Sequence, residues 1–214
     1  MLNCSVLKNN AGVVLTGDYW SLRSLRETVH DINERSPLIA DRDGLFIGLA
    51  YDVRKAYECQ REVIKPPETA PEFGVRYGVK ILWPVILLQY QMLRQSLSFV
   101  DHGPQHQAIT YALQFAIESE ISKDFAASQT DIKQAWNDIN LRDPKTFELL
   151  YSRAGLYCSW ARAERKRGLA TLLASFSPNY QEIYSINLKR GKKLLISPSD
   201  FIDWENREWP NPRW

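Results

Sequence analysis

The residues best suited to binding chemistry are basic and lie in the C-terminal third of the sequence. They form two clusters, Arg162, Arg165, Lys166 and Arg167, and then Lys189, Arg190, Lys192 and Lys193. Lysine and arginine side chains contact phosphate groups, and phosphate contacts need no particular spacing between the residues. These eight residues are therefore the predicted nucleic-acid-binding site if the chain binds a nucleic acid.

The distribution of charge is consistent with a polyanionic partner. Residues 141–214 carry 13 Lys and Arg against 8 Asp and Glu, whereas residues 1–140 carry 14 against 17. A basic segment attracts nucleic acid and other polyanions. The two clusters also fit a structural role, because basic residues stabilise a helix C-terminus and a charged hairpin tip protects a sheet edge. Both interpretations stay open.

A histidine near two arginines suggests phosphodiester chemistry. His30 follows Arg23 and Arg26 on one predicted helix. Arginine followed by histidine is the arrangement of a ribonuclease motif found in helical nucleotide-binding domains, where both side chains converge on the scissile phosphate. The same three residues fit the solvated face of a surface helix, and that alternative is favoured here.

The other two histidines have the spacing of a helical metal site. His102 and His106 are four residues apart, which on a continuous helix places both imidazoles on one face. Pro104 lies between them and is expected to begin the helix, so His102 falls outside it. No third ligand is nearby in the sequence, and we predict no metal site.

No motif for catalysis or cofactor binding is present. The sequence has no Gly-rich phosphate loop, no Gly-x-Ser-x-Gly turn and no cysteine pair at metal spacing. Asp52 lies near the buried side of its predicted helix, and we expect it to form a structural ion pair with Arg54 or Arg76. No catalytic residue and no cofactor are therefore predicted.

One apolar stretch organises the predicted fold. Residues Tyr77–Val100 have the highest apolar density in the chain. Pro84 suits a first helical position, so a helix is expected from Trp83–Pro84, fed by a strand at Phe73–Ile81. Apolar residues at three- and four-residue steps, among them Leu87, give this helix one buried face.

Amphipathic periodicity predicts further helices on both sides of this central one. They span about Asp18–Arg35 with Asp18 as the cap, Phe46–Glu62, Gln105–Lys123, Thr130–Asn140 and Lys145–Arg167 with Gly168 as the cap. The run Ile81–Leu88 is too short to cross a bilayer, and the N-terminus has no signal-peptide pattern. We therefore expect a cytoplasmic protein without a membrane partner.

The ends of the chain are predicted to supply a small antiparallel sheet. Leu2–Lys8 and Val13–Gly17 form one expected hairpin, and Gln181–Leu188 and Lys192–Ser197 form the other. The fold class is thus helix-rich α+β, with amphipathic helices around a central helix and residues 1–214 forming a single domain. Trp204–Trp214 is an irregular tail, and we expect its three tryptophans to anchor it.

Two stretches carry a family resemblance. Tyr51–Val63 (YDVRKAYECQREV) and Tyr77–Arg94 (YGVKILWPVILLQYQMLR) resemble a family of bacterial proteins known only as a domain of unknown function. The resemblance extends from about Gly12 to Glu120. It implies a bacterial, cytoplasmic protein and transfers no catalytic residue.

The sequence thus favours a non-enzymatic interaction or regulatory module over an enzyme. The helices, the surplus of aromatic residues and the missing catalytic motif favour this interpretation, with an unknown protein or a second copy of the chain as partner. The alternative is a nucleic-acid-binding protein or ribonuclease that uses the basic C-terminal third.

Overall fold

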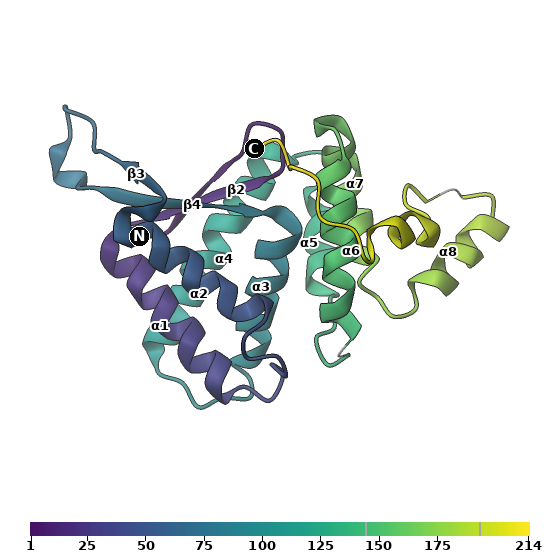
Figure 1. Cartoon of the computed structure of the whole chain (residues 1–214), viewed down its shortest axis with the longest axis horizontal. Coiled ribbons are helices and arrows are strands. Elements are labelled where there is room, and N and C mark those ends of the chain that lie inside the picture. Colours follow the sequence, from purple (N-terminus) through teal and green to yellow (C-terminus); the bar gives the residue numbers. More distant parts are fainter. Residues whose placement is uncertain (144, 193) are drawn as a thin grey trace. The chain divides into compact units, whose positions relative to one another are not determined.

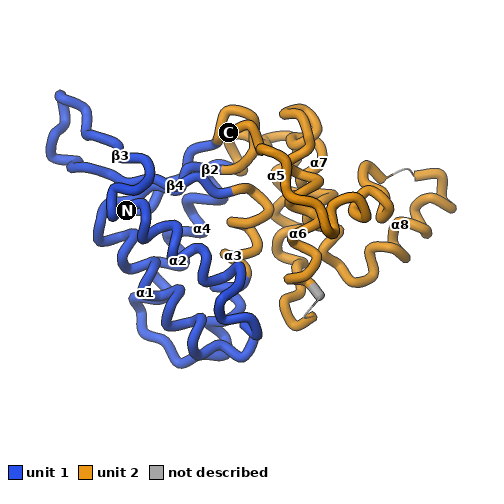
Figure 2. The backbone as a smooth tube through the Cα atoms, viewed as in Figure 1, with its two compact units in different colours: residues 1–6, 13–81, 92–120 blue, residues 7–12, 82–91, 121–214 orange. Residues whose placement is uncertain are grey.

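The computed structural model describes residues 1–143, 145–192 and 194–214, and they form two compact units. Unit 1 contains residues 1–6, 13–81 and 92–120, and unit 2 contains residues 7–12, 82–91 and 121–214 (Figure 2). Many helices accompany a small antiparallel sheet, so the predicted helix-rich α+β class is confirmed (Figure 1). That the whole chain is a single domain stays a prediction.

The sheet has the strand order β1-β2-β4-β3. Its strands are β1 (Asn3–Val6), β2 (Gly12–Gly17), β3 (Glu62–Ile64) and β4 (Arg76–Leu82). The N-terminal hairpin is confirmed, with Cys4 opposite Leu15 in an antiparallel register. Strand β4 lies inside the sheet, because β3 pairs with the side of β4 that faces away from β2, with Val63 opposite Tyr77.

Two helices of unit 1 pack directly against each other. They are α1 (Tyr19–Arg35) and α2 (Leu45–Lys55). Asp18 caps α1 as predicted, since its carboxylate accepts from the backbone N–H of Ser21 at 2.9 Å. The helix predicted to reach Glu62 ends earlier, in a π-helical turn, η1 (Ala56–Gln60), because Cys59 has a φ of 60° that no helix continues. The chain then enters β3.

The central helix α3 (Trp83–Ser96) begins where the sequence predicts. It is more deeply buried than a one-sided helix, because Gln89 and Gln91 are buried along with the apolar residues. Helix α4 (Pro104–Asp124) follows after a short connection. Buried residues on these two helices include Trp83, Ile86, Leu87, Tyr90, Leu113, Ala116 and Ile117.

The first half of α3 forms the core of unit 2 together with α5 (Gln129–Asn137). The Trp136 indole N–H donates to the carbonyl of Leu87 at 2.8 Å, and its ring lies 4.8 Å from that of Tyr90. The rings of Trp83 and Phe125 meet edge to face at 5.7 Å. Large aromatic side chains thus surround α3, and each contact adds to the burial of apolar area.

The predicted helix at Lys145–Arg167 is in fact two helices, α6 (Lys145–Ser159) and α7 (Arg162–Ala174). Ala161 is extended between them, and its N–H donates to the Glu164 carboxylate at 2.8 Å, which caps α7. Gly168 is therefore no terminal cap. It lies inside α7, where a Cβ would approach the Trp160 ring to 2.6 Å, so any larger residue would have to displace that ring.

The predicted C-terminal hairpin is wrong, because this segment forms α8 (Tyr180–Lys189). Gly191 ends α8 at a φ of 72°, and the Lys192 N–H donates to the Asn187 carbonyl at 2.9 Å. This bond is typical of a helix that ends in a left-handed glycine. A glycine after two basic residues suits either a hairpin turn or a helix end, which explains the error.

Two short 3₁₀ helices complete the described elements, and an irregular tail follows the second of them. Pro71–Phe73 forms the short helix η2 in unit 1, and Pro198–Trp204 forms η3, which packs on α6 in unit 2. Trp204 lies on Gly155, and the Trp209 indole N–H donates to the Tyr151 carbonyl at 2.9 Å. Two of the three tail tryptophans therefore anchor the segment, as predicted, whereas Trp214 is exposed.

Replacing Trp209 by alanine is expected to destabilise unit 2. The change removes a partly buried ring and one hydrogen bond, which together are worth about 2 kcal/mol. In a chain of this size that corresponds to a fall in melting temperature of about 4–8 °C. Differential scanning fluorimetry measures it, with Trp214→Ala as the control. Equal melting temperatures for the two variants would show that the tail is not anchored through Trp209.

Candidate binding groove

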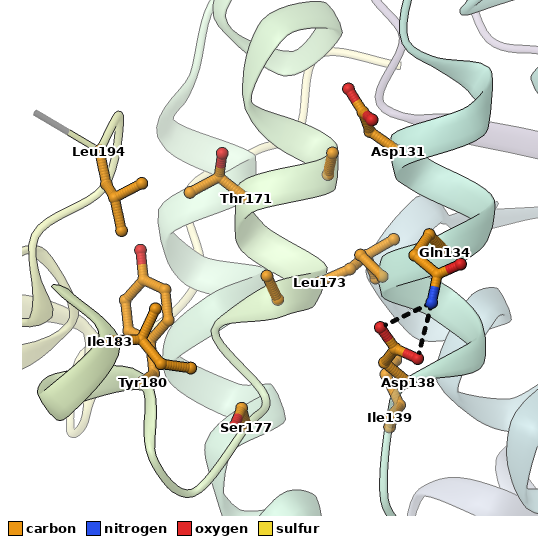
Figure 3. Close-up of a pocket in the computed structure, with 13 residues that line it drawn as sticks. Asp131, Gln134, Asp138, Ile139, Thr171, Leu173, Ser177, Tyr180, Ile183 and Leu194 are labelled. Atoms are coloured by element: carbon orange, nitrogen blue, oxygen red, sulfur yellow. Dashed lines mark hydrogen bonds between the residues drawn. The ribbon is translucent and has the colours of Figure 1, made fainter. Parts of the chain in front are cut away.

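Unit 2 contains an open groove of about 550 Å³ formed by α5, α7 and α8 (Figure 3). This volume lies within the range of known ligand pockets. Helix α7 provides the floor, α5 one wall, and α8 with Leu194 the other wall. Side chains from segments that are distant in sequence thus line one concave surface.

The floor is open because the α7 side chains that face it are small. Ala170, Thr171 and Ala174 lie one helical turn or less apart on α7 and leave room above the helix. Leu173 extends from α7 toward α5, while Ile183 lines the opposite wall. The groove therefore offers a mostly apolar surface to a ligand.

The α5 wall adds negative charge. Asp131 and Asp138 both line the groove and both are exposed. Asp138 accepts from the Gln134 side-chain amide at 3.0 Å, which fixes the direction of its carboxylate (Figure 3). Asp131 lies in the first turn of α5, where a carboxylate also stabilises the helix dipole. Two carboxylates seven residues apart thus flank an apolar floor.

A buried arginine supports the α8 wall. Arg153 on α6 donates to the Ser175 carbonyl at 3.1 Å, just after α7, and lies 3.8 Å from the centre of the Phe201 ring. Burial lowers the pKa of its guanidinium to about 10. The Phe201 ring in turn contacts that of Tyr180, whose hydroxyl donates to the Ile196 carbonyl at 2.8 Å. The groove wall therefore rests on a connected set of contacts.

Exposed apolar residues continue from the groove along α8 and beyond it. Ile183, Ile186, Leu188 and Leu195 are between 40 and 56% exposed. Of the α8 residues, Tyr180 alone is described as buried. Ile183 and Ile186 lie on the same side of α8, and exposed apolar surface next to a groove marks interaction sites, because it stays in unfavourable contact with water until something covers it. Sequence reasoning missed this surface because it placed these residues in a strand.

The first basic cluster is partly used for structure. Arg165 is 1% exposed, and its N–H groups donate to the carbonyls of Asn9, Tyr157 and Cys158 at 2.8–3.2 Å. Arg162 donates to the Asn10 side chain at 2.9 Å. Lys166 pairs with Asp124, and Arg167 is exposed. Arg165 is thus a structural residue, and the remaining three keep contact with solvent.

The second basic cluster lies at the far end of α8, whereas α7 begins beside the hairpin loop at Asn10 (Figure 1). Lys189, Arg190 and Lys192 are exposed, and Lys193 lies outside the described residues. These residues occupy a different element from the first cluster. They carry positive charge next to the exposed apolar residues of α8.

The two histidines at metal spacing have other partners. The His106 Nε2 lies 3.0 Å from an Asp31 carboxylate oxygen, and the His102 Nδ1 lies 2.7 Å from the Val100 carbonyl oxygen. His102 lies outside α4, as predicted from Pro104. In the described part of the chain, no three His, Cys, Asp or Glu residues gather closely enough to hold a metal ion.

The predicted ion pair of Asp52 is wrong. Arg54 instead pairs with Glu58 at 2.9 Å, and Arg76 bonds the Met1 carbonyl. Burial raises the pKa of the Asp52 carboxyl, opposed by the charges of Arg61 and Lys55. Asp52 is half-buried in α2 and lines neither of the two described pockets, so it remains unassigned to a site.

Comparison with known proteins assigns a family. Residues 3–214 match the model of a family described as Domain of unknown function (DUF6904). The chain belongs to this family. The match covers nearly the whole chain, more than the 12–120 segment in which the resemblance was seen. Neither the curated proteins nor the solved structures include a match to this DUF6904 chain. Over its described ranges, no helix has the length and hydropathy of a membrane span.

Proposed function

We propose that this DUF6904 chain is a non-enzymatic interaction module that binds a basic amphipathic segment of a partner protein. The observation that carries the proposal is the groove on α5, α7 and α8, which combines an apolar floor with the carboxylates of Asp131 and Asp138. An amphipathic helix binds such a groove through its apolar face. Lysine or arginine on the adjacent face of that helix would meet the two carboxylates. The bacterial origin and cytoplasmic location expected from the sequence belong to this proposal.

Shape and charge both favour a peptide over a small polar metabolite. The floor residues Ala170 and Ala174 are too short to enclose a ligand, and the groove is open along its length. Ile186 is exposed and lies about one helical turn beyond the groove residue Ile183 on the same side of α8. A small molecule would leave this side chain in water, whereas a helical segment would cover it.

A labelled model peptide tests this function directly. The probe is an 18-residue helix-forming peptide with leucine on one face and lysine on the other, read by fluorescence polarisation. Its twin carries glutamate in place of lysine. We expect the basic peptide to bind and the acidic twin to bind at least about tenfold more weakly, because the α5 wall repels it.

Variants locate the binding to the groove. Asp131→Asn/Asp138→Asn keeps the side-chain shape and removes both charges, so binding should weaken by about fivefold to thirtyfold, as expected for two exposed ion pairs. Ala174→Trp fills the floor and should abolish binding. The matched control, Glu148→Gln/Glu208→Gln, removes two exposed carboxylates that do not line the groove and should bind like the parent. Equal binding by all variants would refute the proposal.

Light scattering on the same variants identifies the partner class. A parent dimer that Ala174→Trp converts to a monomer would show that the occupant is a second copy of the chain. This outcome is consistent with the positive charge of Lys189 and Arg190 beside the exposed α8 residues.

The alternative function is nucleic-acid binding through the basic C-terminal third. Its support is that Arg162, Arg167, Lys189, Arg190 and Lys192 are exposed. Arg165 no longer contributes to it. The variant Arg167→Gln/Arg190→Gln would weaken binding of a nucleic acid if this alternative holds, and would leave peptide binding unchanged.

A further inference from the structure

A second surface, in unit 1, combines aromatic rings with cations along the seam where α1 and α2 pack. Tyr19 on α1 meets Tyr57 in η1 with ring centres 5.2 Å apart, and His30 meets Tyr51 at 6.1 Å. The chain therefore runs in opposite directions on the two sides of the seam. Eleven residues separate Tyr19 from His30, which is about 16 Å of helix.

The rings at this seam are available to a ligand. Trp20 is 70% exposed and Tyr51 is 46% exposed. Trp20 also contacts the Tyr19 ring at 5.1 Å, so the Tyr19 end of the seam holds three connected rings. Exposed aromatic side chains are costly in water, and each offers a face on which a planar group can stack.

Two arginines carry positive charge near the His30 end of the seam. Arg26 lies one helical turn before His30 on α1, and Arg54 lies on α2. Burial, and then the positive charges of Arg26 and Arg54, lower the pKa of His30, while Glu34 acts in the opposite sense. Two arginine charges against one carboxylate thus surround the His30 imidazole.

Two of these groups have donors without partners. The Arg26 Nε and the His30 Nε2 make no hydrogen bond in the described structure and are enclosed by protein, whereas the Arg26 and His30 side chains as a whole are half-buried and keep part of their surface open to solvent. A buried polar atom left unpaired costs about 1–3 kcal/mol, so such atoms usually mark a missing partner. Arg23 and Arg54 differ, because each forms an exposed ion pair, with Glu27 and Glu58 respectively.

We infer that the α1–α2 seam is a binding site for single-stranded nucleic acid. Bases would stack on Tyr19, Trp20 and Tyr51, and a backbone phosphate would accept hydrogen bonds from the terminal N–H groups of the half-buried Arg26 guanidinium. Aromatic platforms beside arginines bind single strands without sequence preference, because every base has a stacking face. At 3.4 Å per stacked nucleotide, a seam of about 16 Å accommodates about five nucleotides. This site is independent of the groove in unit 2.

Duplex nucleic acid does not fit the same chemistry. Its bases are stacked on one another and present no free face to Tyr51 or Trp20. An acidic peptide would pair with the Arg26 guanidinium, but it would leave the aromatic rings at both ends of the seam without planar groups to stack on. The combination of rings and unpaired donors therefore favours a single strand.

Fluorescence polarisation with defined oligonucleotides tests the inference. The probes are a 12-nucleotide oligouridine, the equivalent oligothymidine and a 12-base-pair duplex, each in 50 mM salt. We expect both single strands to bind and the duplex to bind at least about tenfold more weakly. Raising the salt should weaken single-strand binding with a slope set by the number of phosphates contacted.

Three variants locate the site. Arg26→Gln/Tyr51→Ala should weaken single-strand binding by about tenfold or more, since it removes one stacking ring and one phosphate contact. Tyr51→Phe keeps the ring and should bind like the parent. The matched control, Lys65→Gln/Phe115→Ala, removes one exposed charge and one exposed ring elsewhere in unit 1 and should stay within about twofold.

The outcomes separate this site from the other proposals. Three results would each overturn the inference. The first is an absence of single-strand binding by the parent at 50 μM protein, and the second is an equal loss of binding in the seam and control variants. The third is a loss of binding confined to Arg167→Gln/Arg190→Gln. Circular dichroism of every variant checks the fold, and if the double variant unfolds, Arg26→Gln alone provides the second test, because it removes the phosphate contact and should still weaken single-strand binding. Peptide binding in the groove should be unchanged by all seam variants, so the two proposals fail separately.

Discussion

Replacing Leu87 by alanine is expected to lower the free energy of unfolding by about 2–5 kcal/mol. Leu87 is fully buried in α3, and its carbonyl accepts the indole N–H of Trp136 at 2.8 Å. Large aromatic rings at Trp83 and Tyr90 lie on the same helix and hold the surrounding side chains in place. The site therefore has little freedom to collapse around the missing methyl groups, and the cavity should remain.

Urea denaturation followed by tryptophan fluorescence measures this loss. The control is Leu195→Ala, the same chemical change at a residue that is 53% exposed, where a change below about 0.5 kcal/mol is expected. A value for Leu87→Ala as small as that of the control would contradict the placement of α3 at the centre of the fold.

The second large effect is expected for Arg165→Lys, a substitution that keeps the charge. The planar guanidinium donates to three carbonyls, those of Asn9, Tyr157 and Cys158. A lysine ammonium is a compact donor and does not reproduce this fork, so buried carbonyls lose their partners. At about 1–3 kcal/mol for each unsatisfied group, we expect a loss of about 2–4 kcal/mol.

Arg167→Lys is the matched control, since it is the same change two residues along the same helix at an exposed side chain. It should alter stability by less than about 0.5 kcal/mol. Similar stabilities for the two variants would show that Arg165 does not hold the segments of unit 2 together. In that case it would return to the set of residues available for phosphate contacts.

The sequence predicted those elements whose signals were local. Two helix starts could be predicted from one or two residues each. Asp18 can cap the helix that follows it, and Pro84 suits the first turn of the helix that begins at Trp83. The N-terminal hairpin follows equally from a turn-rich break between β-prone runs. Local capping and turn chemistry was therefore sufficient for these elements.

The errors arose where tertiary contacts decide between two locally acceptable structures. The chain is extended at Ala161 between α6 and α7, and this break lets Trp160 lie next to Gly168. The run from Ile183 to Leu188 alternates like a strand yet forms a helix that Gly191 terminates. No local pattern distinguishes these outcomes, because they depend on which residues meet in space.

The candidate sites were predicted less well than the fold. Basic residues are easily found in a sequence, but whether they are buried is not. Arg165 is buried because it donates to backbone carbonyls, and one of these, at Asn9, lies in the N-terminal hairpin loop, far away in the sequence. The groove is lined by alanines and isolated carboxylates that form no motif. The α1–α2 seam likewise requires Tyr51 and His30 to meet across two helices.

A nuclear magnetic resonance titration tests the central claim most directly. Uniformly ¹⁵N-labelled protein is titrated with the unlabelled basic amphipathic peptide, and amide shifts are followed residue by residue. If the groove is the binding site, the shifted amides should cluster at Asp131–Asp138, Ala170–Ala174 and Tyr180–Ile183, and Ala174→Trp should suppress them. Shifts concentrated on α1 and α2, or a uniform response that persists in Ala174→Trp, would contradict the assignment of the groove.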